Sequence, residues 1–156
     1  MPHIHDKVDF TVEVFIVCKD RVLLRKHDKY GIWLSVGGHI ELDEDPVESA
    51  LREVKEEVGL DVELIGTVQQ SDEKNYKELL PPRFVNRHRI SDTHEHIAFT
   101  YFAASASDNV VQGDTEQTEE WKWLSKKELK NLPFEISEHV QRYALAALDA
   151  AASTSL

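Results

Sequence analysis

A segment near the N-terminus is apolar on two alternating sets of positions, and this restricts where it can lie in a fold. Every second residue from Phe10 to Cys18 is apolar, which is the period of a β-strand. In the second half of the segment Phe15 and Val17 make the intervening positions apolar as well. A strand that is apolar on both sides is covered on both faces, so residues 9–18 are predicted to form a central strand of a sheet.

The rest of the chain alternates strand-like and helix-like segments. Strands are also predicted at residues 22–25, 31–36, 60–68, 97–103 and 120–124, and helices at 46–58, from a capping box at 125–128, and at 137–151. Residues 152–156 are expected to fray. The stretch Ser71–Glu95 is predicted to be a long irregular loop with a functional role. Strands interleaved with helices predict one α/β domain, residues 1–156, with helices packed on a mixed sheet.

Composition narrows the partners and the location of the protein. The formal net charge is −11, from 29 acidic and 18 basic residues, which argues against a nucleic-acid polymer as the partner. No run approaches the roughly 20 apolar residues that span a bilayer, so no membrane association is expected, and the N-terminal residues do not resemble a signal peptide. The single cysteine, Cys18, excludes an intrachain disulfide and favours a reducing, cytoplasmic location.

The most clearly bounded helix is the one predicted over residues 46–58. Asp45 is a good N-cap, Pro46 occupies the first helical position, and Glu48 completes a capping-box pair with Asp45. Gly59 supplies the left-handed residue that ends many helices. The helix is predicted to turn an apolar stripe towards the core, made of Val47, Ala50, Leu51, Val54 and Val58.

Three carboxylates cluster beside that stripe. Glu53 lies three residues before Glu56 and four before Glu57, so both pairs are neighbours on the helix surface and repel by roughly a few tenths of a kcal/mol each. A solvated face accounts for most glutamate runs in helices. A divalent cation would instead convert the repulsion into ligation, because Mg²⁺ prefers carboxylate oxygens and keeps waters that phosphates can displace. Periodicity alone leaves both interpretations open.

The spacing around these glutamates distinguishes the two interpretations. From Gly38 the chain reads Gly, five residues, Glu44, seven residues, Arg-Glu-Val, one residue, Glu-Glu, one residue, and Gly59-Leu60. This pattern resembles the Nudix box, with every defining position filled. We therefore interpret the segment Gly38–Leu60 as the chemical centre of the molecule.

The similarity to the Nudix family extends over most of the chain, although its specific part is the box. Trp33 stands where the family enters the box, and Trp123-Leu124 resembles the family's late strand. Two departures are visible. Val36 stands where proline often precedes the glycine pair, and Asp43 stands where glycine is frequent. Neither residue changes the set of candidate ligands.

The resemblance implies both a fold and a reaction. The fold is a Nudix-like α/β/α sandwich with a central mixed β-sheet. The reaction is Mg²⁺-dependent hydrolysis of a pyrophosphate bond in a nucleoside diphosphate-linked, nucleotide-like small molecule, with a metal-activated water as nucleophile and Mn²⁺ as a possible substitute. A homodimer is also possible, because dimers are common in the family.

The resemblance also implies roles for particular residues. The metal ligands would be the Gly37 carbonyl, Glu41, Glu53, Glu56 and Glu57. Glu53 would act as a ligand or as the base that activates water. Arg52 would hold the glutamates by charge-assisted hydrogen bonds, and Glu44 would support the site or balance its charge. Replacement of Glu57 by Gln is predicted to reduce turnover by orders of magnitude and to leave folding nearly intact, because it removes a metal ligand from an exposed face.

Roles for residues outside the box rest on single residues and are less specific than the box pattern. Members of the family use a further glutamate before the late strand, and Glu116 is preferred here over Glu119 and Glu120. Arg25, Arg83 and Arg87 are candidates to contact distal phosphates, and Trp33 and Tyr76 are candidates to stack on a base. His88, His94 and His96 lack the spacing of a structural zinc site, so local hydrogen bonding is predicted for them.

The sequence leaves the substrate open and leaves two rival functions to be weighed. Asn75 stands where an ADP-ribose pattern has proline, and Tyr76 lies near a tyrosine position of diadenosine polyphosphate hydrolases, while nucleoside triphosphates remain equally plausible. One rival is a catalytically inactive nucleotide-sensing module on the same fold, which the intact glutamate set disfavours. The other is a diphosphate-ester isomerase, which needs a cysteine in the site, whereas Cys18 is predicted to lie outside it.

Overall fold

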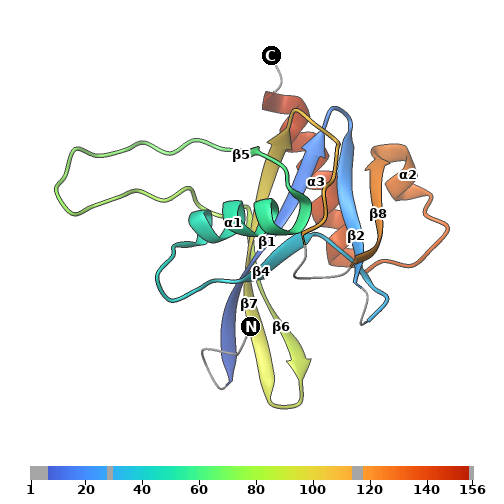
Figure 1. Ribbon diagram of the computed structural model, residues 1–156, viewed down its shortest axis with the longest axis horizontal. Coiled ribbons are helices and arrows are strands. Elements are labelled where there is room, and N and C mark those ends of the chain that lie inside the picture. The colour runs from blue at the N-terminus through green and yellow to red at the C-terminus, as the bar shows by residue number, and fades with distance from the viewer. Residues whose placement is uncertain (1–6, 28–29, 114–117, 155–156) are drawn as a thin grey trace.

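The computed structural model describes residues 7–27, 30–113 and 118–154. Figure 1 shows the elements in chain order: β1 (Val8–Cys18), β2 (Arg21–His27), β3 (Trp33–Leu34), β4 (Val36–His39), α1 (Pro46–Val58), β5 (Val62–Leu64), β6 (Phe84–Ser91), β7 (His94–Ser105), β8 (Thr118–Ser125), α2 (Lys126–Lys130) and α3 (Glu138–Thr154).

One mixed sheet joins the strands of the described residues. Its main path is β3-β2-β1-β7-β5, while β4 pairs with β1, β6 with β7, and β8 with β2. β1 and β7 run parallel in register from Val8 opposite Glu95 to Val17 opposite Ala104, and the other pairs are antiparallel. The strand predicted to be central therefore is central, because β1 has partners along both edges.

The two faces of β1 belong to two different cores. Val12, Val14 and Ile16 pack with Ala50 and Val54 of α1. Phe15 and Val17 pack on the opposite face, in a second core with α3 residues that include Tyr143, Ala144 and Ala147. Figure 1 accordingly shows α1 in front of the sheet and α3 behind it. The predicted α/β/α sandwich is confirmed.

The predicted loop Ser71–Glu95 is only partly a loop, because its last two residues belong to β7 and residues 84–91 are also a strand. The loop prediction was therefore wrong for both segments. Residues 84–91 form β6, which pairs with β7 from Phe84 opposite Thr100 to Ser91 opposite His94. Most of β6 is partly or fully exposed, so it lacks the apolar alternation that reveals a strand. The strand predicted at 60–68 is also shorter than expected, since β5 covers only Val62–Leu64. Figure 1 shows the segment between β5 and β6 extending away from the sheet.

Helix ends agree with the sequence signals more closely than strand ends do. Asp45 accepts a hydrogen bond from Glu48 N, the reciprocal capping bond is present, and Gly59 has a left-handed φ of 67°. Within the predicted apolar stripe only Leu51 departs clearly, because it is 41% exposed. α3 continues to Thr154, beyond the predicted start of fraying at residue 152, and residues 155–156 lie outside the described residues.

Among the described residues, no helix is both long enough and apolar enough to cross a lipid bilayer.

Candidate active site

Helix α1 is held against the sheet so that its carboxylates meet the loop that follows β4. Ala50, Val54 and Val58 are fully buried and anchor one side of the helix. Because Glu53 and Glu57 neighbour that side, they are drawn towards the sheet, whereas Glu56 remains at the surface with a side chain that is 51% exposed. The three glutamates therefore share one helix but lie at different depths.

The glycine pair of β4 allows this close approach. A Cβ at Gly38 would lie 2.2 Å from Glu53 Oε1, and a Cβ at Gly37 would lie 2.1 Å from the carbonyl oxygen of Val12. Neither space can accept a side chain without movement. The two glycines are therefore required for different contacts, Gly37 for packing on β1 and Gly38 for seating the Glu53 carboxylate.

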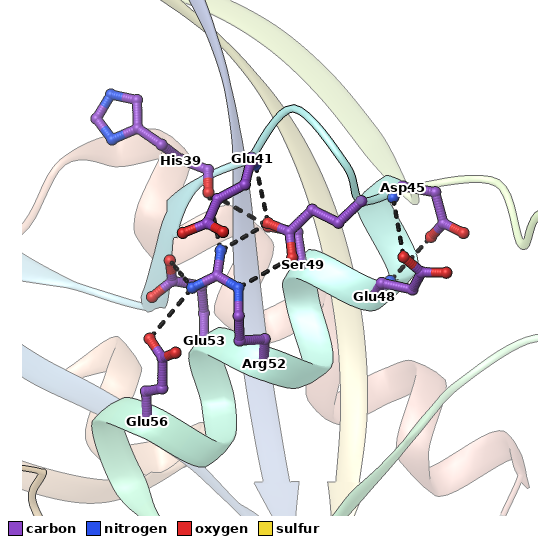
Figure 2. A network of polar contacts seen from close by, with 9 residues as sticks. His39, Glu41, Asp45, Glu48, Ser49, Arg52, Glu53 and Glu56 are labelled. Atoms are coloured by element: carbon purple, nitrogen blue, oxygen red, sulfur yellow. Dashed lines mark hydrogen bonds and ion pairs between the residues drawn. The ribbon is translucent and has the colours of Figure 1, made fainter. Parts of the chain in front are cut away.

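Arg52 joins the glutamates into one network (Figure 2). Its guanidinium donates to both carboxylate oxygens of Glu44, from Nε at 2.9 Å and from Nη2 at 2.6 Å. Nη1 donates to Glu53 and to Glu56, both at 3.1 Å, and Nη2 also donates to the carbonyl of His39 at 3.1 Å. One planar group thus fixes the positions of three carboxylates.

The charges in this network reinforce one another. Hydrogen bonding from Arg52 is the largest influence on Glu44 and lowers the pKa of that carboxyl. The bond to Glu44 is correspondingly the largest influence that raises the pKa of Arg52. Glu44 also accepts from the backbone N–H of Glu41 at 2.9 Å. Glu44 therefore ties the guanidinium to the loop that precedes the helix.

Glu57 is a buried carboxylate, which differs from the exposed position predicted for it. Its Oε1 lies 3.5 Å from Nη2 of Arg25, and the two side chains are only 5% and 8% exposed. Its Oε2 accepts from the backbone N–H of Gly37 at 3.4 Å. Arg25 also donates to the carbonyl of Ser35 at 3.3 Å. Arg25 therefore lies behind Glu57 and orients it, a position that does not fit the predicted direct contact with substrate phosphates.

The side chains at this site fit a hard divalent cation. Glu53, Glu56 and Glu57 offer carboxylate oxygens from a single helix, while Gly37 lies on β4 and Glu41 on the loop that follows it. Mg²⁺ and Mn²⁺ prefer such all-oxygen sets, and a positive ion offsets the repulsion among the acids. Glu53 and Glu56 share Arg52, and Glu57 approaches the backbone of Gly37, so these predicted ligands line the side of α1 that meets β4.

The other residues predicted to contact substrate lie apart from one another, on a strand and in the long loop between β5 and β6. Trp33 is buried and stacks on Phe134 with ring centroids 4.7 Å apart, in the core on the α3 side. This packing does not fit the predicted base stacking. Tyr76 is 51% exposed and donates to Glu78 in the long loop. Arg83 donates to the carbonyl of Ile65 at 3.4 Å.

Two further predictions concern β6 and the loop before β8. Arg87 lies on β6 and forms an ion pair with Glu95 at 2.8 Å, in the β6–β7 hairpin. Glu116 lies outside the described residues, as does the side chain of Glu119. Glu120 is exposed on β8, where it pairs with Lys26 of β2.

Sequence analysis missed a second polar group near the box. Asp9, His39, His94 and His96 come from three strands and lie close together. Desolvation by burial, followed by the charges of the neighbouring imidazoles, lowers the pKa of His96 to about 4. Only the register of β1 against β7, which sets Asp9 opposite His96, reveals the group. Local sequence spacing carries no signal for a contact between residues so far apart.

Comparison with known proteins agrees with this fold. A family model for the NUDIX domain matches residues 9–146. A hydrolase of the NUDIX family from Clostridium perfringens has a crystal structure with a TM-score of 0.78 and 39% sequence identity, over 90% of this chain and 96% of that one. A MutT NUDIX hydrolase from Burkholderia pseudomallei has a TM-score of 0.63 at 22% identity, over 90% and 98% of the two chains, and supports the fold alone.

A curated relative agrees at lower similarity. An RNA pyrophosphohydrolase from Bartonella clarridgeiae is 26% identical over 118 residues, which are 72% of this chain and 68% of that protein. A sheet between two helices, with a carboxylate-bearing helix organised by one arginine, defines a hydrolase of phosphorus-containing anhydrides. The chain belongs to the Nudix hydrolase family, which acts on pyrophosphate bonds and generally uses a divalent metal. This membership favours an enzyme over the nucleotide-sensing alternative.

Proposed function

We propose that this chain uses Mg²⁺ to hydrolyse a pyrophosphate bond in a small nucleotide-like substrate, with water as the nucleophile. The donor set of Glu53, Glu56 and Glu57 contains only oxygen, which favours Mg²⁺, with Mn²⁺ as a substitute, over softer ions. When bound, the ion supplies charge neutralisation at the phosphate oxygens and activation of the attacking water.

The observation that carries this proposal is the bridge that Arg52 makes between Glu44 and the two glutamates Glu53 and Glu56. A guanidinium held at both edges cannot swing away to solvent without breaking several charge-assisted bonds. The carboxylates it contacts are therefore preorganised before a ligand arrives, which reduces the reorganisation needed during reaction. A helix with a merely solvated acidic face has no need of such a clamp.

Glu53 is our candidate for the residue that accepts the proton from water. Its side chain is 13% exposed and its carboxylate rests against the backbone of Gly38. Arg52 donates to Oε1, which fixes the orientation of the group. Glu116 is a second candidate for this role, by resemblance to the family. We assign Arg25 to positioning Glu57 rather than to binding substrate.

A small molecule is the favoured substrate class. The net charge of −11 disfavours extended contact with a polyanion, while one diphosphate bridge can be bound through a divalent cation. The RNA pyrophosphohydrolase relative makes the 5′ end of RNA a specific competitor. Only the terminal phosphates would have to enter the site in that case, so a triphosphorylated oligonucleotide belongs in any substrate panel.

The proposal is tested by incubating the protein with Mg²⁺ and a panel of nucleoside triphosphates, dinucleoside polyphosphates, nucleotide sugars and a 5′-triphosphorylated oligonucleotide, with products separated by chromatography. Turnover of at least one small nucleotide that stops on chelation and resumes with Mg²⁺ or Mn²⁺ is expected. Glu56→Gln is expected to reduce the rate by roughly 100-fold or more, because it removes a charged ligand.

Glu63→Gln is the matched control, since Glu63 is an exposed glutamate of β5 that lies outside the site. It should retain the wild-type rate. Turnover that persists in Glu56→Gln, or that needs no divalent ion, contradicts the proposal. Faster hydrolysis of the oligonucleotide than of every small compound contradicts the substrate class but not the reaction.

We also propose a cytoplasmic location and, on family resemblance, a homodimer. The single cysteine supports the first by disfavouring an oxidising compartment. Light scattering of the purified chain measures the second directly.

A further inference from the structure

A second group of metal-binding side chains lies at the end of the sheet where β1 and β7 begin. Asp9 of β1 is 1% exposed, and His94 of β7 is 7% exposed. His96 lies directly opposite Asp9 in the parallel register. One ligand atom from each of these three residues lies within 4.8 Å of the others. Figure 1 shows the starts of these two strands extending beyond the helices.

A fourth side chain approaches from β4. His39 Nε2 lies 3.4 Å from Asp9 Oδ2, and His94 Nε2 lies 3.2 Å from the same oxygen. The ring centroids of His39 and His94 are 5.0 and 5.2 Å from that of His96. Three imidazoles therefore surround one buried carboxylate.

These separations match the requirements of a small tetrahedral ion. Metal–ligand bonds of about 2.0–2.1 Å set neighbouring ligand atoms about 3.3 Å apart. The contacts of Asp9 with His39 and His94 already have this length. The ligand atoms of Asp9, His94 and His96 all lie within 4.8 Å of one another, so side-chain rotation would have to bring His96, and His39 relative to the other two imidazoles, to this spacing. We propose that Asp9, His94 and His96 bind a divalent transition-metal ion of the zinc type, with His39 as the fourth ligand.

This site differs from the Nudix box in chemistry and in place. Imidazole nitrogens favour Zn²⁺ and its transition-metal neighbours, whereas Mg²⁺ favours oxygen and retains its waters. The two sites also lie on opposite faces of the sheet. Asp9 shares the face of Phe15 and Val17, which pack with α3, while the box glutamates belong to α1 on the other face. The two sites can therefore be filled independently.

His39 connects the two sites physically. Its imidazole approaches Asp9, while its backbone carbonyl accepts hydrogen bonds from Arg52 at 3.1 Å and Ser49 at 3.4 Å. Figure 2 shows the ring directed away from the Arg52 network and the carbonyl directed towards it. An ion bound at the histidines would fasten β4 to β1 and β7 at the point where the Nudix loop begins. The site is therefore structural, and its predicted role is to stabilise the fold near the box.

The test is calorimetric titration of Zn²⁺ into chelator-treated protein in the presence of millimolar Mg²⁺, with Co²⁺ absorption spectra as a second readout. Wild type is expected to bind a single strong equivalent, with a rise in Tm. His94→Gln and His96→Gln should each weaken Zn²⁺ binding by at least about 100-fold, because direct ligands matter more than their hydrogen-bond partners. Circular dichroism verifies that the variants fold.

Three control variants distinguish Zn²⁺ binding at this site from Zn²⁺ binding elsewhere on the protein. His27→Gln, on β2, is the matched histidine replacement and should bind as wild type. Glu56→Gln should also retain the site, which makes the result independent of the hydrolase proposal. A variant of His3 and His5, which lie outside the described residues, should keep the Zn²⁺ site. The proposal is overturned if wild type binds no Zn²⁺ above the Mg²⁺ background, or if folded His94→Gln and His96→Gln bind as wild type does.

Discussion

At the residue scale, burial separates glutamates that look equivalent in sequence. Glu56 is half exposed and meets Arg52 at the surface, whereas Glu57 is buried against Arg25 and Gly37. Breaking a buried ion pair leaves the partner charge uncompensated, which costs more than losing a surface pair. Two carboxylates that serve one ion can therefore differ widely in what they contribute to the fold.

This difference predicts stability effects of different size for two variants that both lose activity. Glu57→Gln should lower the free energy of unfolding by about 1–3 kcal/mol, because Arg25 keeps its charge in a buried place. Glu56→Gln should change it by less than about 0.5 kcal/mol. Urea denaturation of both variants in the presence of chelator measures the two values.

The stability loss expected for Glu57→Gln differs from the sequence-based prediction that this replacement leaves folding nearly intact. That expectation rested on helix periodicity, which locates Glu57 beside the apolar stripe but cannot show Arg25 arriving from β2. Equal stability of the two variants would contradict the buried pair.

At the element scale, local signals predicted α1 well and failed for β6. The cap at Asp45, the stop at Gly59 and the glutamate spacing all lie within one short segment, so sequence suffices to define the helix and the positions of its glutamates. β6 is held by pairing with β7 and by contacts such as Arg87 with Glu95, and it shows no clear apolar periodicity. The contact of Asp9 with His94 depends likewise on strand register, which no local pattern records.

The contact between β4 and its two neighbours predicts a contrast between the adjacent glycines. In Gly37→Ala the new methyl meets the backbone oxygen of Val12, which cannot rotate away, so the free energy of unfolding should fall by about 1–3 kcal/mol. In Gly38→Ala the methyl meets the end of the Glu53 side chain, which can move at little cost. Its stability should change by less than about 1 kcal/mol, while turnover falls at least tenfold because Glu53 is displaced.

Thermal melts in chelator and rate measurements in Mg²⁺ on the same preparations check both parts. The argument fails if Gly38→Ala loses stability and keeps its activity, since that outcome places the strain in the backbone and not at the carboxylate.

At the scale of the whole molecule, one sheet supports two kinds of site. β1 contributes Val12 and Val14 to the core under α1, and Asp9 to the histidine group on the other face. β4 lies at the junction, with Gly38 against Glu53 and His39 against Asp9. The fold thus provides separate faces for an oxygen-rich and a nitrogen-rich site. His39 contacts both, through its backbone carbonyl at Arg52 and its imidazole at Asp9.

Acid should unfold the molecule partly through its helix caps. Burial opposes ionisation of Asp45, but hydrogen bonds from the Glu48 backbone and from Lys77 outweigh it, and the pKa of Asp45 is lowered in the folded state. A lowered folded-state pKa means that the stabilising contribution is fully present above the unfolded value of 3.8 and is lost as pH falls through the folded value. Below about pH 4 the free energy of unfolding of wild type should therefore fall more steeply than that of a variant with a neutral residue at the N-cap.

Asp45→Asn isolates this contribution, because asparagine also caps helices well but has no proton to gain. The variant should be slightly less stable than wild type at pH 7, where it lacks the charge that attracts Lys77 across 3.3 Å. Its unfolding midpoint should then converge with that of wild type as pH falls towards 3 in chelator. Parallel curves over this range would show that the capping carboxylate titrates equally in both states, and that acid unfolding starts elsewhere in the molecule.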